Sequence, residues 1–305
     1  MRVHRIHIRP YGGEASLEET FAYCLKQGVL GIGWRLASGK TEASWEEYLA
    51  EAQEIFKDAR DVHKDFWAQR YIKDQVKPGD LVWTRDTQGN YYLAKVLSGW
   101  EYWMHPEAVE KGIDIANIFR VTFRPVDLDA VPGKIIASFR AARTIQGINS
   151  PPTVEYTKFL WNKLAGHQEY RLDEKVASDP FELLDDEETE DLVFLYLQDQ
   201  GWYVVPGSRK GDTMRYEFYV VHPKTGERGM VQVKTGNTPL DRNAYASAPG
   251  TVFLFQPHGR YLGEEKPNVR CLTRDELLGF VERAYAWLPK RHRFVMDLHR
   301  ELSGN

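Results

Sequence analysis

Apolar and charged residues alternate over 2–9, and this alternation predicts a β-strand at the start of the chain. A helical pattern follows over 14–27, with Ser16 as its N-cap, and a longer amphipathic helix begins at Ser44. The short run 29–34 between these helices is typical of a strand.

Two β-rich runs, 80–85 and 91–97, are joined by the turn residues 86–90 and predict a hairpin. The runs 118–124 and 134–139 are further strand candidates. We therefore expect residues 1–148 to form an α+β domain, with a barrel-like sheet and two helices.

A structure-breaking Asn-Ser-Pro-Pro run at 149–152 predicts a domain boundary. We expect a linker over 149–186, with a short helix at 154–164. Residues 187–305 then read as an α/β domain, a mixed sheet flanked by helices. Its predicted helices are 187–200 and 274–288, and its predicted strands are 202–206, 214–222, 229–235, 251–256 and 269–272.

Length and composition agree with two globular domains. The chain has 305 residues, of which 42% are hydrophobic and 28% charged. No apolar run approaches the ~18–20 residues of a membrane span, and the N-terminus has no signal-peptide core, so we expect no membrane association. The two cysteines, Cys24 and Cys271, exclude a disulfide framework and fit a cytoplasmic location. At a net charge of −4, any nucleic-acid binding needs local basic patches.

The hairpin predicted over 214–235 gathers polar side chains on one face. When its turn is centred on Thr225 and Gly226, Glu217 lies opposite Lys234. Because strand side chains alternate, Glu217, Gln232 and Lys234 share one face, and the apolar residues share the other. A simple cross-strand ion pair is the alternative interpretation.

This hairpin resembles the active-site hairpin of the PD-(D/E)xK nuclease superfamily. Glu217 matches the acidic residue of the first strand, and Gln232-Val233-Lys234 matches the (E/Q)-x-K of the second. Glutamine in place of glutamate is similar to the Mrr-like restriction endonuclease branch. The resemblance covers about residues 186–290 and implies a restriction-endonuclease-like fold.

A helix before the hairpin often supplies another glutamate in this superfamily. Glu190, eleven residues before Gly201, has the matching spacing. Acidic residues at a helix start also complement the helix dipole, which is the alternative role for Glu190. Asp212 is a second-ranked candidate for the first acid.

The resemblance implies a Mg²⁺-dependent endonuclease, with Mn²⁺ as a substitute, acting on phosphodiester bonds of double-stranded DNA in restriction-like defence against phage DNA. Glu217, the Gln232 side-chain oxygen and the Val233 carbonyl would hold the metal. Lys234 would orient water or stabilise developing charge, and Glu190 would assist. Because a double-strand cut needs two active centres, a homodimer is compatible with this function.

Several basic residues near the hairpin are candidate phosphate contacts: Arg209, Lys210, Arg215 and Arg242. The basic run 290–293 and Arg300 form a further candidate near the C-terminus. Solvated surface charges are the alternative for each.

The first domain has a more distant resemblance to PUA/EVE-like barrels, which accompany restriction nucleases and read modified bases. Trp34, Trp83 and Trp100 are candidates for stacking a flipped base, with Tyr102 and Trp103 beside them in the sequence. Core packing is the alternative for each. Lys134, Arg140 and Arg143 are candidate phosphate contacts.

Two other functions remain open at this point. A catalytically silent nucleic-acid-binding regulator would use the same fold, with Gln232 marking weakened metal binding. A nuclease that acts on RNA would use the same residues.

Overall fold

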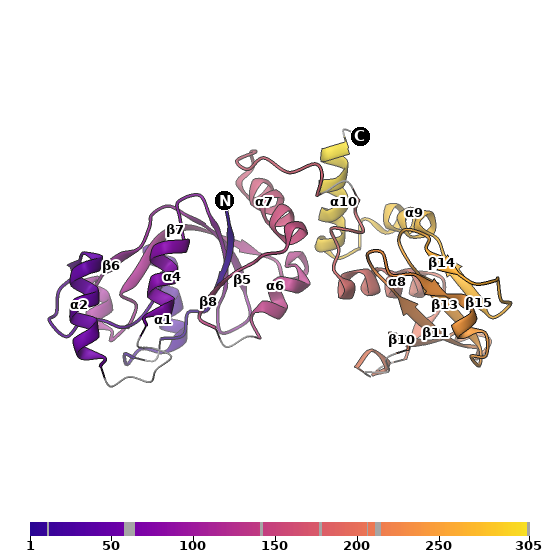
Figure 1. The fold of residues 1–305 in the computed structure, drawn as a ribbon, viewed down its shortest axis with the longest axis horizontal. Coiled ribbons are helices and arrows are strands. Elements are labelled where there is room, and N and C mark those ends of the chain that lie inside the picture. The colour runs from indigo at the N-terminus through magenta and orange to yellow at the C-terminus, as the bar shows by residue number, and fades with distance from the viewer. Residues whose placement is uncertain are drawn as a thin grey trace. The chain divides into compact units, whose positions relative to one another are not determined.

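The structure, a computed structural model, describes residues 1–10, 12–57, 65–140, 143–176, 179–205, 207–210 and 215–303, with Lys210 and Ser303 described by their backbone alone. The chain divides into two compact units, Met1–Arg171 and Leu172–Asn305 (Figure 1). The segment 149–186, expected as a linker, is divided between them. Within the described ranges, no helix combines the length and the apolar character needed to cross a membrane.

Unit 1 contains a mixed eight-stranded sheet in which β1 and β4 are parallel. The path runs β3-β6-β7-β5-β4-β1-β8, and β2 pairs with β7 off this path. The strands are β1 (Val3–Ile6), β2 (Val29–Ile32), β3 (Glu42–Ala43), β4 (Leu81–Arg85), β5 (Tyr91–Val96), β6 (Glu101–Trp103), β7 (Asn117–Val126) and β8 (Ile145–Gly147).

The first two helices of unit 1 begin at serine caps. Ser16 and Ser44 each form a capping box with the glutamate three residues later, as the sequence predicts for their helices. The helices are α1 (Leu17–Gln27), α2 (Trp45–Ile55), α4 (Trp67–Gln75), α5 (Pro106–Glu110), α6 (Gly133–Ser138) and α7 (Pro151–Ala165), and a 3₁₀ turn η1 spans Leu128–Ala130.

Three expectations for unit 1 are wrong. The described part of unit 1 has six α-helices instead of the expected two. The described strands form an open sheet rather than a barrel, because β3 and β8 at its two ends do not pair with one another. The run 134–139 is helical: the Pro132 carbonyl accepts hydrogen bonds from the amides of Ile135 and Ile136. The buried residues there are Ile135 and Phe139, four apart, which is a helical spacing rather than that of a strand.

Unit 2 is built on a mixed five-stranded sheet in the order β15-β13-β11-β10-β9. β11, β13 and β15 run parallel, whereas β10 is antiparallel to both β9 and β11. These strands are β9 (Tyr203–Val204), β10 (Phe218–Val221), β11 (Arg228–Val233), β13 (Thr251–Phe255) and β15 (Val269–Leu272). β12 (Leu240–Asp241) and β14 (Tyr261–Leu262) form a separate parallel pair.

Three α-helices accompany this sheet in the described part of unit 2: α8 (Asp186–Asp199), α9 (Arg274–Ala284) and α10 (Lys290–Ser303), with 3₁₀ turns η2 (Ser208–Lys210) and η3 (Arg242–Tyr245). Capping boxes begin α8, from Asp185 to Glu188, and α9, from Thr273 to Glu276. An α/β unit with a mixed sheet and helices is thus the observed architecture.

Candidate active site

The β10–β11 hairpin brings the predicted residues to one face, in a register that differs from the expected one by two residues. Phe218 pairs with Val231, so Glu217 falls opposite Gln232 rather than opposite Lys234. The amide of His222 donates to the Glu227 carbonyl (2.8 Å), which closes a four-residue loop. Gly226 is the last residue of that loop, at φ 72°, instead of lying at its centre. A shift of two residues preserves the face, so the predicted grouping survives.

Glu217 is the centre of the group. The Gln232 amide nitrogen donates to Glu217 Oε1 at 2.5 Å and to the Val233 carbonyl at 3.2 Å. Lys234 Nζ lies 3.6 Å from the same Glu217 oxygen. Gln232 is buried, whereas the side chains of Glu217 and Lys234 are 26% and 43% exposed. The side chain of Gln232 is therefore fixed in the interior, whereas those of Glu217 and Lys234 are open to a ligand.

Helix α8 adds the fourth predicted residue. Burial, together with the negative charge of Glu217, raises the pKa of the Glu190 carboxyl to about 7. Two carboxylates therefore repel each other beside the hairpin. The hydroxyl of Thr235, just beyond Lys234, donates to Asp186 and ties the end of β11 to the first turn of α8.

The residues present fit a hard divalent cation. Two carboxylates, one amide and the Val233 carbonyl supply oxygen atoms, the ligands that Mg²⁺ prefers. A cation at this place would also offset the repulsion between Glu190 and Glu217. The Gln232 amide presents its nitrogen to Glu217, so ligation through its oxygen requires the amide group to turn over.

The arginines predicted to contact phosphate each have partners within unit 2. Arg209 forms an ion pair with Asp191 (2.5 Å) and lies over the ring of Phe194. Arg215 donates to the Ala244 carbonyl. The side chain of Lys210 and the whole of Asp212 lie outside the described residues.

Arg242 is also engaged. Its guanidinium donates to the Gly263 carbonyl (3.0 Å) and to Cys271 Sγ (3.3 Å), and it lies over the ring of Tyr261. These contacts hold Arg242 against β14 and β15, so its side chain also has a structural role.

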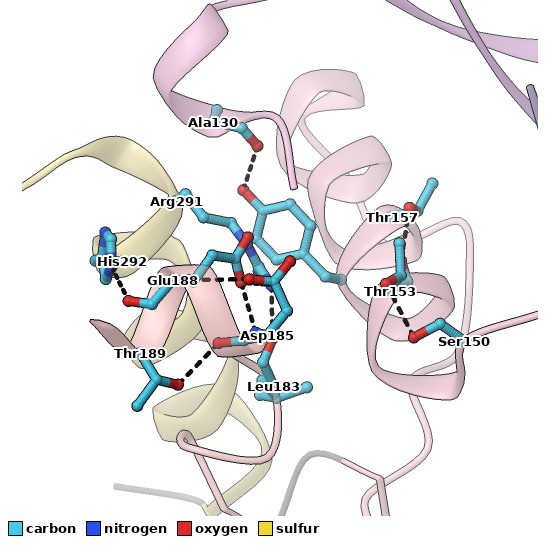
Figure 2. Close-up of polar contacts among 11 residues, drawn as sticks. Ala130, Ser150, Thr153, Thr157, Leu183, Asp185, Glu188, Thr189, Arg291 and His292 are labelled. Carbon is cyan, nitrogen blue, oxygen red and sulfur yellow. Dashed lines mark hydrogen bonds and ion pairs between the residues drawn. The ribbon is translucent and has the colours of Figure 1, made fainter. Parts of the chain in front are cut away.

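A buried charge pair that the sequence analysis missed joins α8 to α10 (Figure 2). Arg291 donates through Nε and Nη2 to the two oxygens of Glu188, at 2.8 and 2.9 Å, and to the Leu183 carbonyl at 2.5 Å. His292 Nε2 donates to the Glu188 carbonyl (2.9 Å), and burial lowers the pKa of this imidazole. Arg291 and His292 are 5% and 3% exposed. The basic run 290–293 is therefore not a solvated tail.

A second group of metal-binding residue types lies outside every motif that the sequence analysis identified. Ligand atoms of Asp179, Glu182 and His258 lie within 4.8 Å of one another, the one such group of three in the described ranges. The two ring nitrogens of His258 each lie 4.0 Å from a carboxylate oxygen. Asp179 already accepts a hydrogen bond from Arg274 at 2.8 Å, which competes with metal binding.

The three tryptophans predicted to stack a base lie in different environments in unit 1. Trp83 is fully buried, and its Nε1 donates to Thr157 Oγ1 (3.2 Å), so it belongs to the core and cannot stack a base. Trp34 and Trp100 are half-buried. Trp34 has a left-handed backbone, φ 74°, a strained conformation for a bulky residue.

Trp34 and Trp100 belong to an aromatic cluster around Tyr48. The Trp34 ring lies 4.3 Å from that of Phe56, centre to centre, and the Trp100 ring lies 5.7 Å from that of Tyr48. Trp100 Nε1 donates to Asn117 (3.1 Å). Tyr102 is buried in this cluster, whereas Trp103 is half-buried.

No protein-family model, curated protein or solved structure matches this chain. Its function must therefore be argued from the geometry of its own residues.

Proposed function

We propose that this protein is a Mg²⁺-dependent endonuclease that hydrolyses phosphodiester bonds of double-stranded DNA in restriction-like defence against foreign DNA. The observation that carries this proposal is the convergence of Glu217, Gln232 and Lys234 at the end of β11, beside Glu190 of α8. A carboxyl group with a raised pKa, here that of Glu190, beside a second carboxylate and a lysine on a partly open face is typical of sites that handle charge during a reaction.

The metal, Mg²⁺ or Mn²⁺, when bound, polarises a phosphate and lowers the pKa of bound water. Glu217, Gln232 and the Val233 carbonyl would hold it. Lys234 places its ammonium group beside this oxygen cluster and is exposed enough to meet a phosphate oxygen. The carboxyl of Glu190, whose pKa is raised to about 7, exchanges a proton near neutral pH.

In this proposal, unit 1 binds nucleic acid or senses a base modification. The half-buried Trp34 and Trp100 support a base-stacking role, because each exposes part of a ring within an aromatic cluster. A homodimer would supply the two active centres that a double-strand cut needs.

One observation favours a second function, that of a silent nucleic-acid-binding regulator. Glu217 Oε1 accepts a hydrogen bond from Gln232 and lies 3.6 Å from the ammonium group of Lys234. The Glu217 carboxylate therefore has polar partners that do not depend on a metal. A neutral amide also binds a hard cation less strongly than a carboxylate does.

A plasmid-cleavage assay decides between these functions. The full chain is incubated with supercoiled plasmid and Mg²⁺ or Mn²⁺, with EDTA as the control. We expect metal-dependent nicking, and we expect Lys234→Ala to lower the rate by about 10²–10³-fold, because it removes one preorganised charge. Its matched control is Lys224→Ala, at the exposed turn of the same hairpin.

Cleavage by Lys234→Ala at the Lys224→Ala rate would place any activity elsewhere. No metal-dependent cleavage of either duplex DNA or single-stranded RNA by the wild-type chain would favour the silent regulator. Cleavage of RNA but not of duplex DNA would support the same active site, with RNA as its substrate.

A further inference from the structure

Arg5 of β1 is a buried arginine with no carboxylate partner among the described residues. It is fully buried, and its guanidinium donates to the Arg143 carbonyl at 2.5 Å and to the Ser138 carbonyl at 2.7 Å. It also lies over the ring of Phe139, 5.4 Å from the centre. Arg5 thus holds the backbone of Ser138 and of Arg143.

The groups around Arg5 are cationic. Arg5, His7 and Arg9 follow one another at the alternating spacing of an extended chain. Arg85 of β4 also lies over the Phe139 ring, 4.9 Å from its centre. Burial, together with the charges of Arg85, Arg9 and Arg143, lowers the pKa of Arg5 to about 10. The pKa of His7 falls to about 4 for the same reasons, so His7 is neutral at physiological pH.

Nothing in the described part of the chain neutralises this group. No carboxylate forms an ion pair with Arg5, Arg9, Arg85 or Arg143 there. The nearest acidic residue along the chain from Arg85 is Asp86. It is occupied by its own turn, where Oδ1 accepts hydrogen bonds from the amides of Gln88 (2.9 Å) and Asn90 (2.8 Å). Gathering four arginines without counter-charge opposes folding, and a bound polyanion would remove that repulsion.

We propose that Arg9, Arg85 and Arg143 form a phosphate-binding surface on unit 1 that holds the backbone of duplex DNA, with the buried Arg5 as the residue that positions it. Arg9 and Arg143 are exposed and Arg85 is half-buried, so all three can reach a ligand, whereas Arg5 cannot. Guanidinium groups suit phosphate because they donate two hydrogen bonds in one plane. Several cations side by side suit a run of phosphates better than a single free anion.

The choice of nucleic acid as the ligand rests on the proposed function. The surface itself lies in unit 1, and it is tested by measuring binding in the absence of cleavage. The full chain is titrated against a labelled DNA duplex in EDTA, and fluorescence anisotropy is followed between about 50 and 200 mM salt. The test variant is Arg9→Gln with Arg143→Gln. Its control is Lys26→Gln with Lys111→Gln, which removes the same formal charge from cations that already pair with Glu107.

We expect the arginine variant to bind about 10- to 100-fold more weakly, with the slope of log K against log salt smaller by about 2, because two phosphate contacts are lost. The lysine control should stay close to wild type. Circular dichroism and the melting temperature establish that both variants fold.

Equal affinities and slopes for the two variants would overturn the proposal, and plasmid cleavage would still measure the proposed function separately. Binding that depends on the arginines, without plasmid cleavage, would support the surface and overturn the nuclease. Failure of the wild-type chain to bind the duplex would overturn the surface.

Discussion

Helix α8 carries two glutamates, Glu188 and Glu190, in opposite electrostatic situations. Glu188 is buried against α10 and receives two hydrogen bonds from Arg291, so its charge is fully compensated (Figure 2). Glu190, two residues later and about 200° around the helix, meets Glu217 and has a raised pKa. A carboxylate with a dedicated partner holds the fold together, whereas one facing a like charge is suited to a cation or a proton.

The two buried arginines in the described part of the chain repeat this contrast, one in each unit. Arg291 of unit 2 has a carboxylate partner, and Arg5 of unit 1 has backbone carbonyls alone and arginine neighbours. Burial by itself therefore does not separate structural from functional charges. The sign of the charges beside a buried group separates the structural charges from the functional ones.

The largest effect is expected from breaking the compensated pair. Arg291→Ala should lower the free energy of unfolding by about 3–5 kcal/mol, because it removes the buried cation that pairs with Glu188. Urea unfolding measures this change. Arg300→Ala, an exposed position on the same helix, should change stability by less than about 0.5 kcal/mol. Similar values for the two variants would mean that the pair does not support the fold.

A smaller effect of opposite sign is expected at the uncompensated glutamate. The pKa of Glu190 is about 7 in the folded chain and lower in the unfolded chain, so the folded state binds the proton more tightly. Wild-type stability should therefore fall, relative to Glu190→Gln, as pH rises from about 4.5 through 7.

Above pH 7 we expect Glu190→Gln to be more stable by about 1–2 kcal/mol, a value reduced because water screens this half-buried group. Melting temperatures at acidic and alkaline pH, without divalent ions, measure it. A difference that is constant with pH would show that Glu190 titrates normally.

The smallest effect is expected at Gln232, a buried side chain that donates a hydrogen bond to Glu217. Gln232→Glu replaces the donor to Glu217 by a third carboxylate and should lower stability by about 1 kcal/mol in EDTA. Mg²⁺ should then raise the melting temperature more than it does in wild type, because metal binding is linked to folding. Gln232→Met, which has no ligand oxygen, is the control. An equal response of both variants to Mg²⁺ would argue against a metal at this hairpin.

Features with local causes were the ones that the sequence could predict. The caps at Ser16 and Ser44 and the alternation along β10 and β11 each depend on residues close together in the chain. The face shared by Glu217, Gln232 and Lys234 follows from alternation alone. The exact partner of Glu217 does not, because register also depends on where Gly226 falls in the turn.

Long-range packing was not predictable in the same way. The side chain of Trp83 gives no sign that Thr157 of α7 will cover it, 74 residues later. The capping box of Asp185 and Glu188 is legible in the sequence, but the partner of the Glu188 side chain comes from α10. Strand closure is likewise a property of the whole sheet, so the strand pattern of unit 1 did not distinguish an open sheet from a barrel.

The contact between Glu188 and Arg291 has a consequence for how the chain is made. The two residues lie 103 positions apart, and Arg291 is synthesised after Glu188. At ~5–20 residues per second, Glu188 is added to the chain roughly 5–20 seconds before Arg291. During that interval the first helix of unit 2 cannot bury this glutamate at low cost, so unit 2 completes its fold only when translation of α10 is finished. A ribosome that stalls before α10 therefore leaves unit 2 without its final packing, and with a half-built site beside the hairpin.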